Sequence, residues 1–145
     1  MDKNRVIGFK IKCISNMIRR NLDDRFSEPE FEGLTGVQNA MMGFIMDNTA
    51  KKDVFQKDIE KEFNIRRSTA TVMLQGLEQK GYIRRISVAY DARLKKIELT
   101  EKAEKLQQRV RHEIDLFHAE IEKDFSDEER EQLLYLLDKI KKNLE

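Results

Sequence analysis

Basic side chains are concentrated in one stretch of the chain, between Arg66 and Lys96. The stretch carries eight lysine or arginine residues against two acidic residues, Glu78 and Asp91. The remainder is balanced or slightly acidic, and the whole chain has a formal net charge of +1. Guanidinium and ammonium groups bind phosphates, so a basic segment in a nearly neutral chain indicates a surface that contacts nucleic acid. An ordinary solvated surface is the alternative that charge alone leaves open.

Residues for catalysis or metal binding do not occur in a recognisable arrangement. The 145 residues contain no GxSxG, phosphate-binding loop or HExxH motif, so no enzyme activity is expected. His112 and His118 are the only histidines, and six residues separate them, so on a helix they face different sides. No metal site and no cofactor is therefore predicted.

The single cysteine, Cys13, cannot form an internal disulfide, which fits a reducing cytoplasm. A buried structural thiol is the favoured interpretation of Cys13, and oxidant sensing is the alternative. The sequence has no run of about 18 apolar residues and no apolar signal core, so it predicts a cytoplasmic protein without a membrane partner.

Helical periodicity dominates the rest of the chain. Apolar residues recur at spacings of three and four, and three capping-box patterns begin at Thr35, Asp53 and Ser126. Predicted helices cover residues 3–26, 35–48, 54–63, 68–80, a long segment after Thr100, and a last one after Ser126. Gly81 supplies a C-terminal stop for the fourth of these helices.

One short segment has the alternation of a β-hairpin instead. The predicted strands are Arg84–Tyr90 and Leu94–Leu99, and the predicted tip is Asp91–Arg93. Apolar residues should pack the hairpin onto the domain while the basic ones face outward; the packing residues are Ile86, Val88, Ile97 and Leu99. The fold class is thus mainly α with a small β-hairpin.

A short helix, a turn, a second helix and a basic hairpin in this order make a winged helix-turn-helix. The helix over 68–80 can enter the major groove of DNA, where Gln75 can reach an adenine edge. The hairpin tip can enter the minor groove, and Asp91 is expected to order the tip and aim Arg93. The predicted contacts to double-stranded DNA are Arg66, Arg67, Ser68, Thr69, Thr71, Gln75, Arg84, Arg85, Asp91, Arg93 and Lys95.

The segments FQKDIEKEFNIRRSTATVMLQGLEQKGYIRR and DARLKKIELTEKAEKL resemble the multiple antibiotic resistance regulator (MarR) family of dimeric winged-helix repressors. Its most specific parts are LEQKGYI-R, the D-x-R pair of Asp91 and Arg93, and the I-E-LT-EKA that follows. The resemblance covers nearly the whole chain. It implies a transcriptional regulator, expected to be a repressor released from its operator by a small-molecule effector or an oxidant.

The first, fifth and sixth helices carry more apolar surface than a small winged-helix core needs. We expect residues 1–145 to form one domain, with residues 35–100 as the DNA-binding portion and residues 1–26 and 101–145 as the dimerisation portion. The expected interface residues are Ile14, Ile18, Phe117, Ile121, Leu137 and Leu144. A homodimer would bind a pseudo-palindromic operator. Completion of a monomer core is the alternative role for these side chains.

Two further alternatives concern ligands and function. The second helix holds Met41, Met42, Phe44 and Met46, and the first holds Met17. These side chains could line an effector pocket, although core packing is the favoured interpretation. The winged-helix fold could also serve as a protein-interaction module that binds no specific DNA. The density of arginine and lysine around the hairpin favours DNA.

Overall fold

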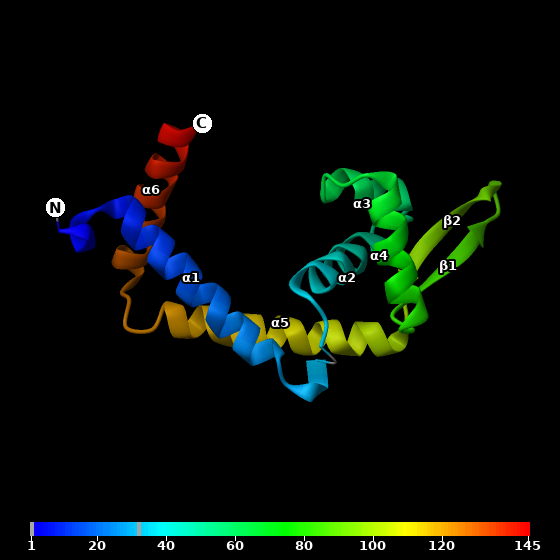
Figure 1. The fold of residues 1–145 in the computed structure, drawn as a ribbon, viewed down its shortest axis with the longest axis horizontal. Coiled ribbons are helices and arrows are strands. Elements are labelled where there is room, and N and C mark those ends of the chain that lie inside the picture. Colours follow the sequence, from blue (N-terminus) through cyan, green and yellow to red (C-terminus); the bar gives the residue numbers. More distant parts are fainter. Residues whose placement is uncertain (1, 32) are drawn as a thin grey trace. The chain divides into compact units, whose positions relative to one another are not determined.

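The computed structural model describes residues 2–31 and 33–145, which form two compact units, Met1–Arg111 and His112–Glu145. Within these residues the chain forms six α-helices, two short 3-10 helices and one antiparallel hairpin (Figure 1). The predicted class, mainly α with a winged helix-turn-helix, is confirmed. None of the described helices is long and apolar enough to cross a membrane.

The first unit begins with the 3-10 helix η1 (Lys3–Arg5) and helix α1 (Ile7–Phe26), close to the predicted range. No described side chain of α1 is buried within the single chain. After α1, the 3-10 helix η2 (Pro29–Phe31) returns the chain, and Phe26 packs edge-on against Phe31 with ring centroids 5.0 Å apart.

Helix α2 (Gly36–Thr49) begins at the predicted capping box. The Thr35 hydroxyl accepts from the Gln38 backbone N–H at 3.2 Å, and the Gln38 side chain accepts from the Thr35 N–H at 3.0 Å. These two bonds satisfy backbone donors that the first turn of a helix leaves unpaired.

Helix α3 (Gln56–Glu62) begins later than predicted, and the predicted cap at Asp53 is wrong. Phe55 is the N-cap residue, and its N–H donates to the Asp58 carboxylate at 2.9 Å. Val54 precedes the helix, and its carbonyl accepts from the Ile97 N–H of the hairpin at 2.7 Å. This sheet-like bond keeps residues 53–55 out of the helix.

A tight turn leads from α3 to helix α4 (Arg67–Gln79), with Asn64 in the left-handed region at a φ of 48°. Gly81, at a φ of 76°, ends α4 as predicted. Ala70, Leu74 and Leu77 form its buried face. The remaining predicted inner residue, Met73, is half-buried.

The hairpin consists of β1 (Ile83–Val88) and β2 (Asp91–Leu99), so the predicted tip is misplaced. The turn is formed by Ala89 and Tyr90, and Asp91 already pairs with Val88. Ser87 pairs with Lys95, which leaves the three β2 residues 92–94 without a partner in β1 and makes a bulge. Tyr90 is 68% exposed. In the sequence it continues the alternation of apolar residues, so the pattern places it in the first strand and not in the turn.

The face of the hairpin that packs on the domain also differs in part from the prediction. Val88, Ile97 and Leu99 are buried as expected. Ile86 is only half-buried, because it lies opposite Lys96 on the other face. Ile83, opposite Leu99, provides the buried contact from β1 instead.

Helix α5 (Glu101–Ile121) is capped by Thr100, as predicted, and passes from the first unit into the second. Leu106 and Gln107 are buried in its first half, and the Gln107 amide donates to the side chain of Asn39 in α2 at 3.2 Å. Arg111 also forms an ion pair with Asp47 of α2. These contacts join α5 to the core of the first unit.

The second unit contains the end of α5 and helix α6 (Asp127–Leu144). The predicted capping box is confirmed: the Ser126 hydroxyl accepts from the Glu129 N–H at 3.1 Å, and the Glu129 side chain accepts from the Ser126 N–H at 2.9 Å. None of the α6 side chains is buried within the single chain, although several are leucines.

We expect Leu74→Ala to destabilise the protein by about 2–5 kcal/mol, because Leu74 is fully buried and its removal leaves a cavity. Val72→Ala, on the same helix but at a side chain that is 68% exposed, should change stability by less than about 1 kcal/mol. Urea denaturation followed by circular dichroism measures both. Equal losses in the two variants would contradict the assignment of the buried face.

Candidate nucleic-acid interface

Helix α4 presents a polar face opposite its buried one. Ser68, Thr69 and Gln75 are exposed there, and Val72 lies among them. Small hydroxyl side chains near the start of a helix let its backbone approach another molecule closely, and an exposed amide can pair with a base edge. This face has the size and chemistry that the major groove of B-DNA admits.

The entrance to α4 is held by hydrogen bonds to α3. The Thr71 hydroxyl donates to the Arg67 carbonyl at 2.8 Å and accepts from the Gln56 amide at 2.9 Å. Thr71, a predicted DNA contact, is thus half-buried and already engaged within the protein. Arg66 is the N-cap residue of α4, and its exposed side chain makes no capping bond.

A hollow of about 450 Å³ lies between the helix-turn-helix and the hairpin. Residue 55 and α3 form one wall, Arg67 of α4 another, and the two strands the third. The lining residues are Phe55, Gln56, Lys57, Glu60, Arg67, Arg85, Arg93, Leu94 and Lys95. Five of these nine residues are cationic and one is acidic, so the hollow attracts anions.

Four of the predicted DNA contacts therefore share one site: Arg67, Arg85, Arg93 and Lys95. Sequence reasoning missed Lys57 and Gln56, which join them from α3. Both residues could have been predicted from the helix-turn-helix pattern. In this motif the start of the first helix lies beside the start of the second, as the bond from Gln56 to Thr71 shows. Lys57 lies outside the basic stretch from Arg66 to Lys96, so the local density of charge did not indicate it.

Asp91 bonds to the arginine two residues ahead of it. Its carboxylate accepts from the Arg93 backbone N–H at 3.0 Å and from the Arg93 Nε at 3.2 Å. These bonds lower the pKa of Asp91, the side-chain bond having the larger effect, so Asp91 is ionised at neutral pH. The Arg93 side chain is 91% exposed, so the guanidinium can contact another molecule while it is paired with Asp91. This geometry matches the expected role of Asp91 in ordering Arg93.

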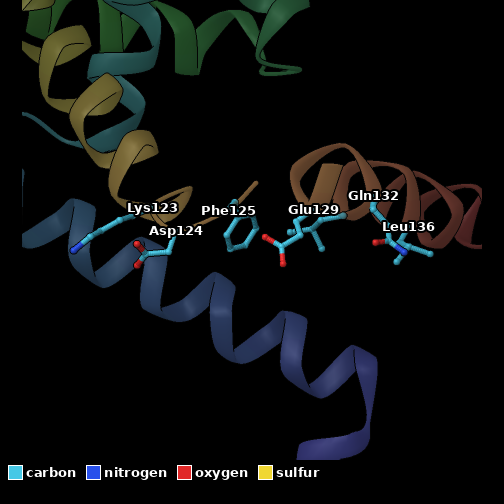
Figure 2. Close-up of a pocket in the computed structure, with 7 residues that line it drawn as sticks. Lys123, Asp124, Phe125, Glu129, Gln132 and Leu136 are labelled. Carbon is cyan, nitrogen blue, oxygen red and sulfur yellow. The ribbon is translucent and has the colours of Figure 1, made fainter. Parts of the chain in front are cut away.

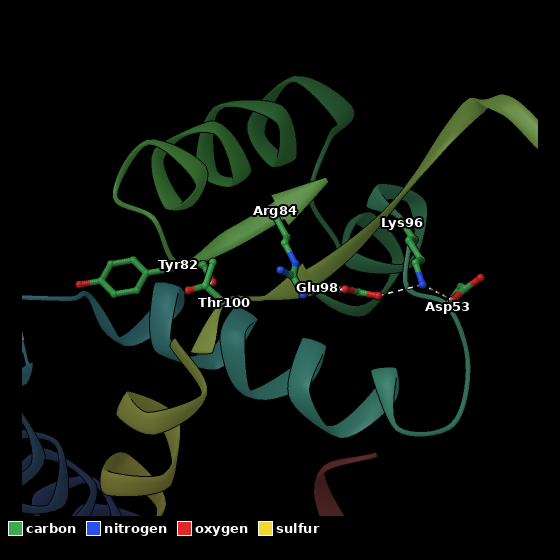
Figure 3. A network of polar contacts seen from close by, with 6 residues as sticks. All are labelled: Asp53, Tyr82, Arg84, Lys96, Glu98 and Thr100. Atoms are coloured by element: carbon green, nitrogen blue, oxygen red, sulfur yellow. Dashed lines mark hydrogen bonds and ion pairs between the residues drawn. The ribbon is translucent and has the colours of Figure 1, made fainter. Parts of the chain in front are cut away.

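Two other cations of the hairpin lie on its opposite face and are paired with acids (Figure 3). Arg84 lies 3.4 Å from Glu98, and the Lys96 ammonium lies 2.8 Å from Glu98 and 3.5 Å from Asp53. The hydrogen bond from Lys96 lowers the pKa of Glu98, and Glu98 in turn raises the pKa of Lys96. Arg84, a predicted DNA contact, is therefore separated from the hollow that contains Arg85.

A second hollow, of about 400 Å³, lies within the second unit at the turn between α5 and α6 (Figure 2). Its lining is partly charged and partly apolar and consists of Lys123, Asp124, Phe125, Glu129, Gln132, Leu133 and Leu136. The methionines considered for an effector pocket lie elsewhere: Met41 and Met42 are fully buried, which confirms core packing for these two. Cys13 is half-buried on α1.

The predicted interface residues are mostly accessible in the single chain. Ile14, Ile121 and Leu137 are between 41% and 51% exposed, Leu144 is 83% exposed, and Ile18 is half-buried. Phe117 differs, because it is already buried at 6% exposure.

Comparison with known proteins gives a consistent assignment. The model of the MarR family matches residues 32–94. The transcription regulator MarR from Oenococcus oeni is 31% identical, with 94% of this chain and 99% of that chain covered and a TM-score of 0.64.

MepR from Staphylococcus aureus is also similar in two solved complexes. The MepR chain in its DNA complex is 25% identical in sequence to this chain. The comparison covers 97% of both chains and has a TM-score of 0.73. The MepR chain bound to ethidium bromide is also 25% identical in sequence. The comparison covers 98% of this chain and 99% of the MepR chain, with a TM-score of 0.75.

We expect Arg93→Ala to weaken duplex binding by roughly 1–3 kcal/mol, because the exposed guanidinium is lost from the hairpin. Asp91→Ala should weaken binding by a smaller amount, because Arg93 remains but is no longer ordered. Fluorescence anisotropy with a labelled duplex measures both. Unchanged affinity in Asp91→Ala would remove the positioning role of Asp91.

Proposed function

The chain belongs to the MarR family of DNA-binding transcription regulators, and we propose that it is a repressor that binds a pseudo-palindromic operator as a homodimer. As a member of this family it is a regulator and not an enzyme. We place its activity in the cytoplasm, where its DNA would be accessible.

The observation that carries the proposal is the combination of the α4 polar face with a cation-lined hollow and an exposed Arg93. Base edges in the major groove require polar side chains on a helix, which Thr69 and Gln75 provide. Phosphates require cations beside that helix, which Arg67, Arg85 and Lys95 provide. MepR, with the same fold, has been solved in complex with DNA.

The homodimer is supported by the apolar side chains that the single chain leaves exposed. Neither α1 nor α6 has a buried side chain among its described residues, yet α1 exposes Ile7, Ile14 and Met17 and α6 exposes a run of leucines. Several large apolar side chains exposed on one helix mark an interaction site. A second copy would bury it and place two recognition helices on half-sites about 10 base pairs apart.

Release from the operator is the regulatory part of the proposal. MepR has been solved with ethidium bromide, so a small organic molecule is the effector class that we propose for this chain. Oxidation of Cys13 is the second route, since its thiol is only half-buried on α1. Cys13→Ser would abolish release by an oxidant in the second route, and it would leave release by a small organic molecule intact in the first.

We expect the protein to prefer the DNA upstream of its own gene over a random duplex, with an affinity that falls steeply as salt rises. Anisotropy titrations at several salt concentrations measure both quantities. Gln75→Ala should reduce the preference for the upstream DNA, whereas the affinity for random duplex should stay nearly constant. Equal, weak binding to both duplexes would contradict the proposal and favour a protein-interaction module.

We expect Leu137→Glu to shift the protein from dimer to monomer, because it places a charge on the exposed apolar face of α6. Asn143→Glu adds the same charge at an exposed polar position of the same helix and should leave the dimer intact. Sedimentation equilibrium measures the two dissociation constants. A wild-type monomer, or equal effects of the two variants, would contradict the α6 interface.

A further inference from the structure

The cation-lined hollow contains one side chain whose bonding is incomplete. The Nε and Nη2 atoms of Arg85 are buried and lack a hydrogen-bond partner among the described residues. The Arg85 side chain is 23% exposed, and its ion-pair partner Glu78, with Oε2 at 3.5 Å from Nε, is itself 44% exposed. A guanidinium has five N–H donors, which match the several oxygens of a phosphate or carboxylate.

The position of Arg85 is fixed by the sheet. Arg85 lies opposite Ile97, which is 1% exposed, so Arg85 shares the face of the hairpin that packs on the domain. That face turns the guanidinium toward the hollow that Lys57 and Arg67 line from the helices. The hollow is therefore built from three separate elements and holds its cations around one space.

The location of the hollow determines which anion it meets in a DNA complex. If α4 enters the major groove and the hairpin enters the neighbouring minor groove, the sugar-phosphate backbone that separates the two grooves must pass between them. The hollow lies between α4 and the hairpin, and both contribute to its lining. In such a complex the DNA strand that separates the grooves would pass over Arg85 and Lys57.

We propose that this hollow binds a backbone phosphate of the operator, with Arg85 as its inner ligand and Lys57 as its outer one. The proposal rests on the proposed DNA-binding function and adds the chemistry of one contact to it. A phosphate is the same at every base pair, so this contact contributes affinity and register but no sequence preference. Sequence preference is left to the exposed face of α4.

The experiment compares Lys57→Gln and Arg85→Gln with Lys61→Gln, an exposed lysine of the same helix that does not line the hollow. Binding to the upstream DNA and to a random duplex is measured over a range of salt concentrations. Each of the first two variants should weaken binding to both duplexes by the same factor. Each should also reduce the slope of log affinity against log salt by about one.

Lys61→Gln should leave the slope of the wild-type protein unchanged. Circular dichroism establishes that the variants are folded, and the exposed Lys57 provides a test that does not depend on the partly buried Arg85.

Three results would overturn the phosphate site while leaving the proposed function in place. One is a salt slope for Lys57→Gln and Arg85→Gln equal to that of Lys61→Gln. Another is a loss of affinity for the upstream DNA alone, which would assign the hollow to base recognition. The third is an unchanged slope together with calorimetric binding of inorganic phosphate that the variants abolish, which would assign the hollow to a free phosphate. Failure of the proposed function is distinct, because the wild-type protein would then bind both duplexes equally and weakly.

Discussion

The hydroxyl group of Thr100 joins the three parts on which the candidate interface depends. It donates to the Gly81 carbonyl at 2.7 Å, just after α4, and accepts from the Ala103 N–H at 3.3 Å, in the first turn of α5. The Thr100 N–H donates to the Tyr82 carbonyl at 2.9 Å. Because one residue ends β2, caps α5 and binds the end of α4, the hairpin is fixed beside the recognition helix.

The pairing of the strands then divides the basic side chains of the hairpin between two environments. Residues directly opposite each other in an antiparallel pair place their side chains on the same face, and neighbours along a strand alternate. Arg85 and Lys95 consequently lie on the face of Ile97 and face the hollow, whereas Arg84 and Lys96 lie on the other face and bind Glu98. A cluster that is uniform in sequence thus separates into anion-binding cations and cations that hold the hairpin.

The second unit and α1 leave most of their apolar side chains exposed in the single chain. Their helices have strong local signals, such as the Ser126 capping box, but little of their apolar surface is buried within one chain. Helix formation in proteins depends mainly on the packing of an apolar face, so these helices need a further surface to pack against. The core of the first unit, in contrast, buries Met41, Met42, Ile45 and Leu74 completely.

The sequence by itself determined the element order, most helix ends and the DNA-binding character, because apolar periodicity, capping residues and local charge depend on neighbours along the chain. Thr35, Gly81, Thr100 and Ser126 act where the sequence placed them. Long-range bonds decided the rest. Because the Val54 carbonyl bonds to Ile97, α3 begins later than the sequence predicted. Because of the register of β1 and β2, the turn lies at Ala89 and Tyr90 and not at the predicted tip. The grouping of Lys57 with Arg85 arises only when α3 and the hairpin meet in space, which no local pattern records.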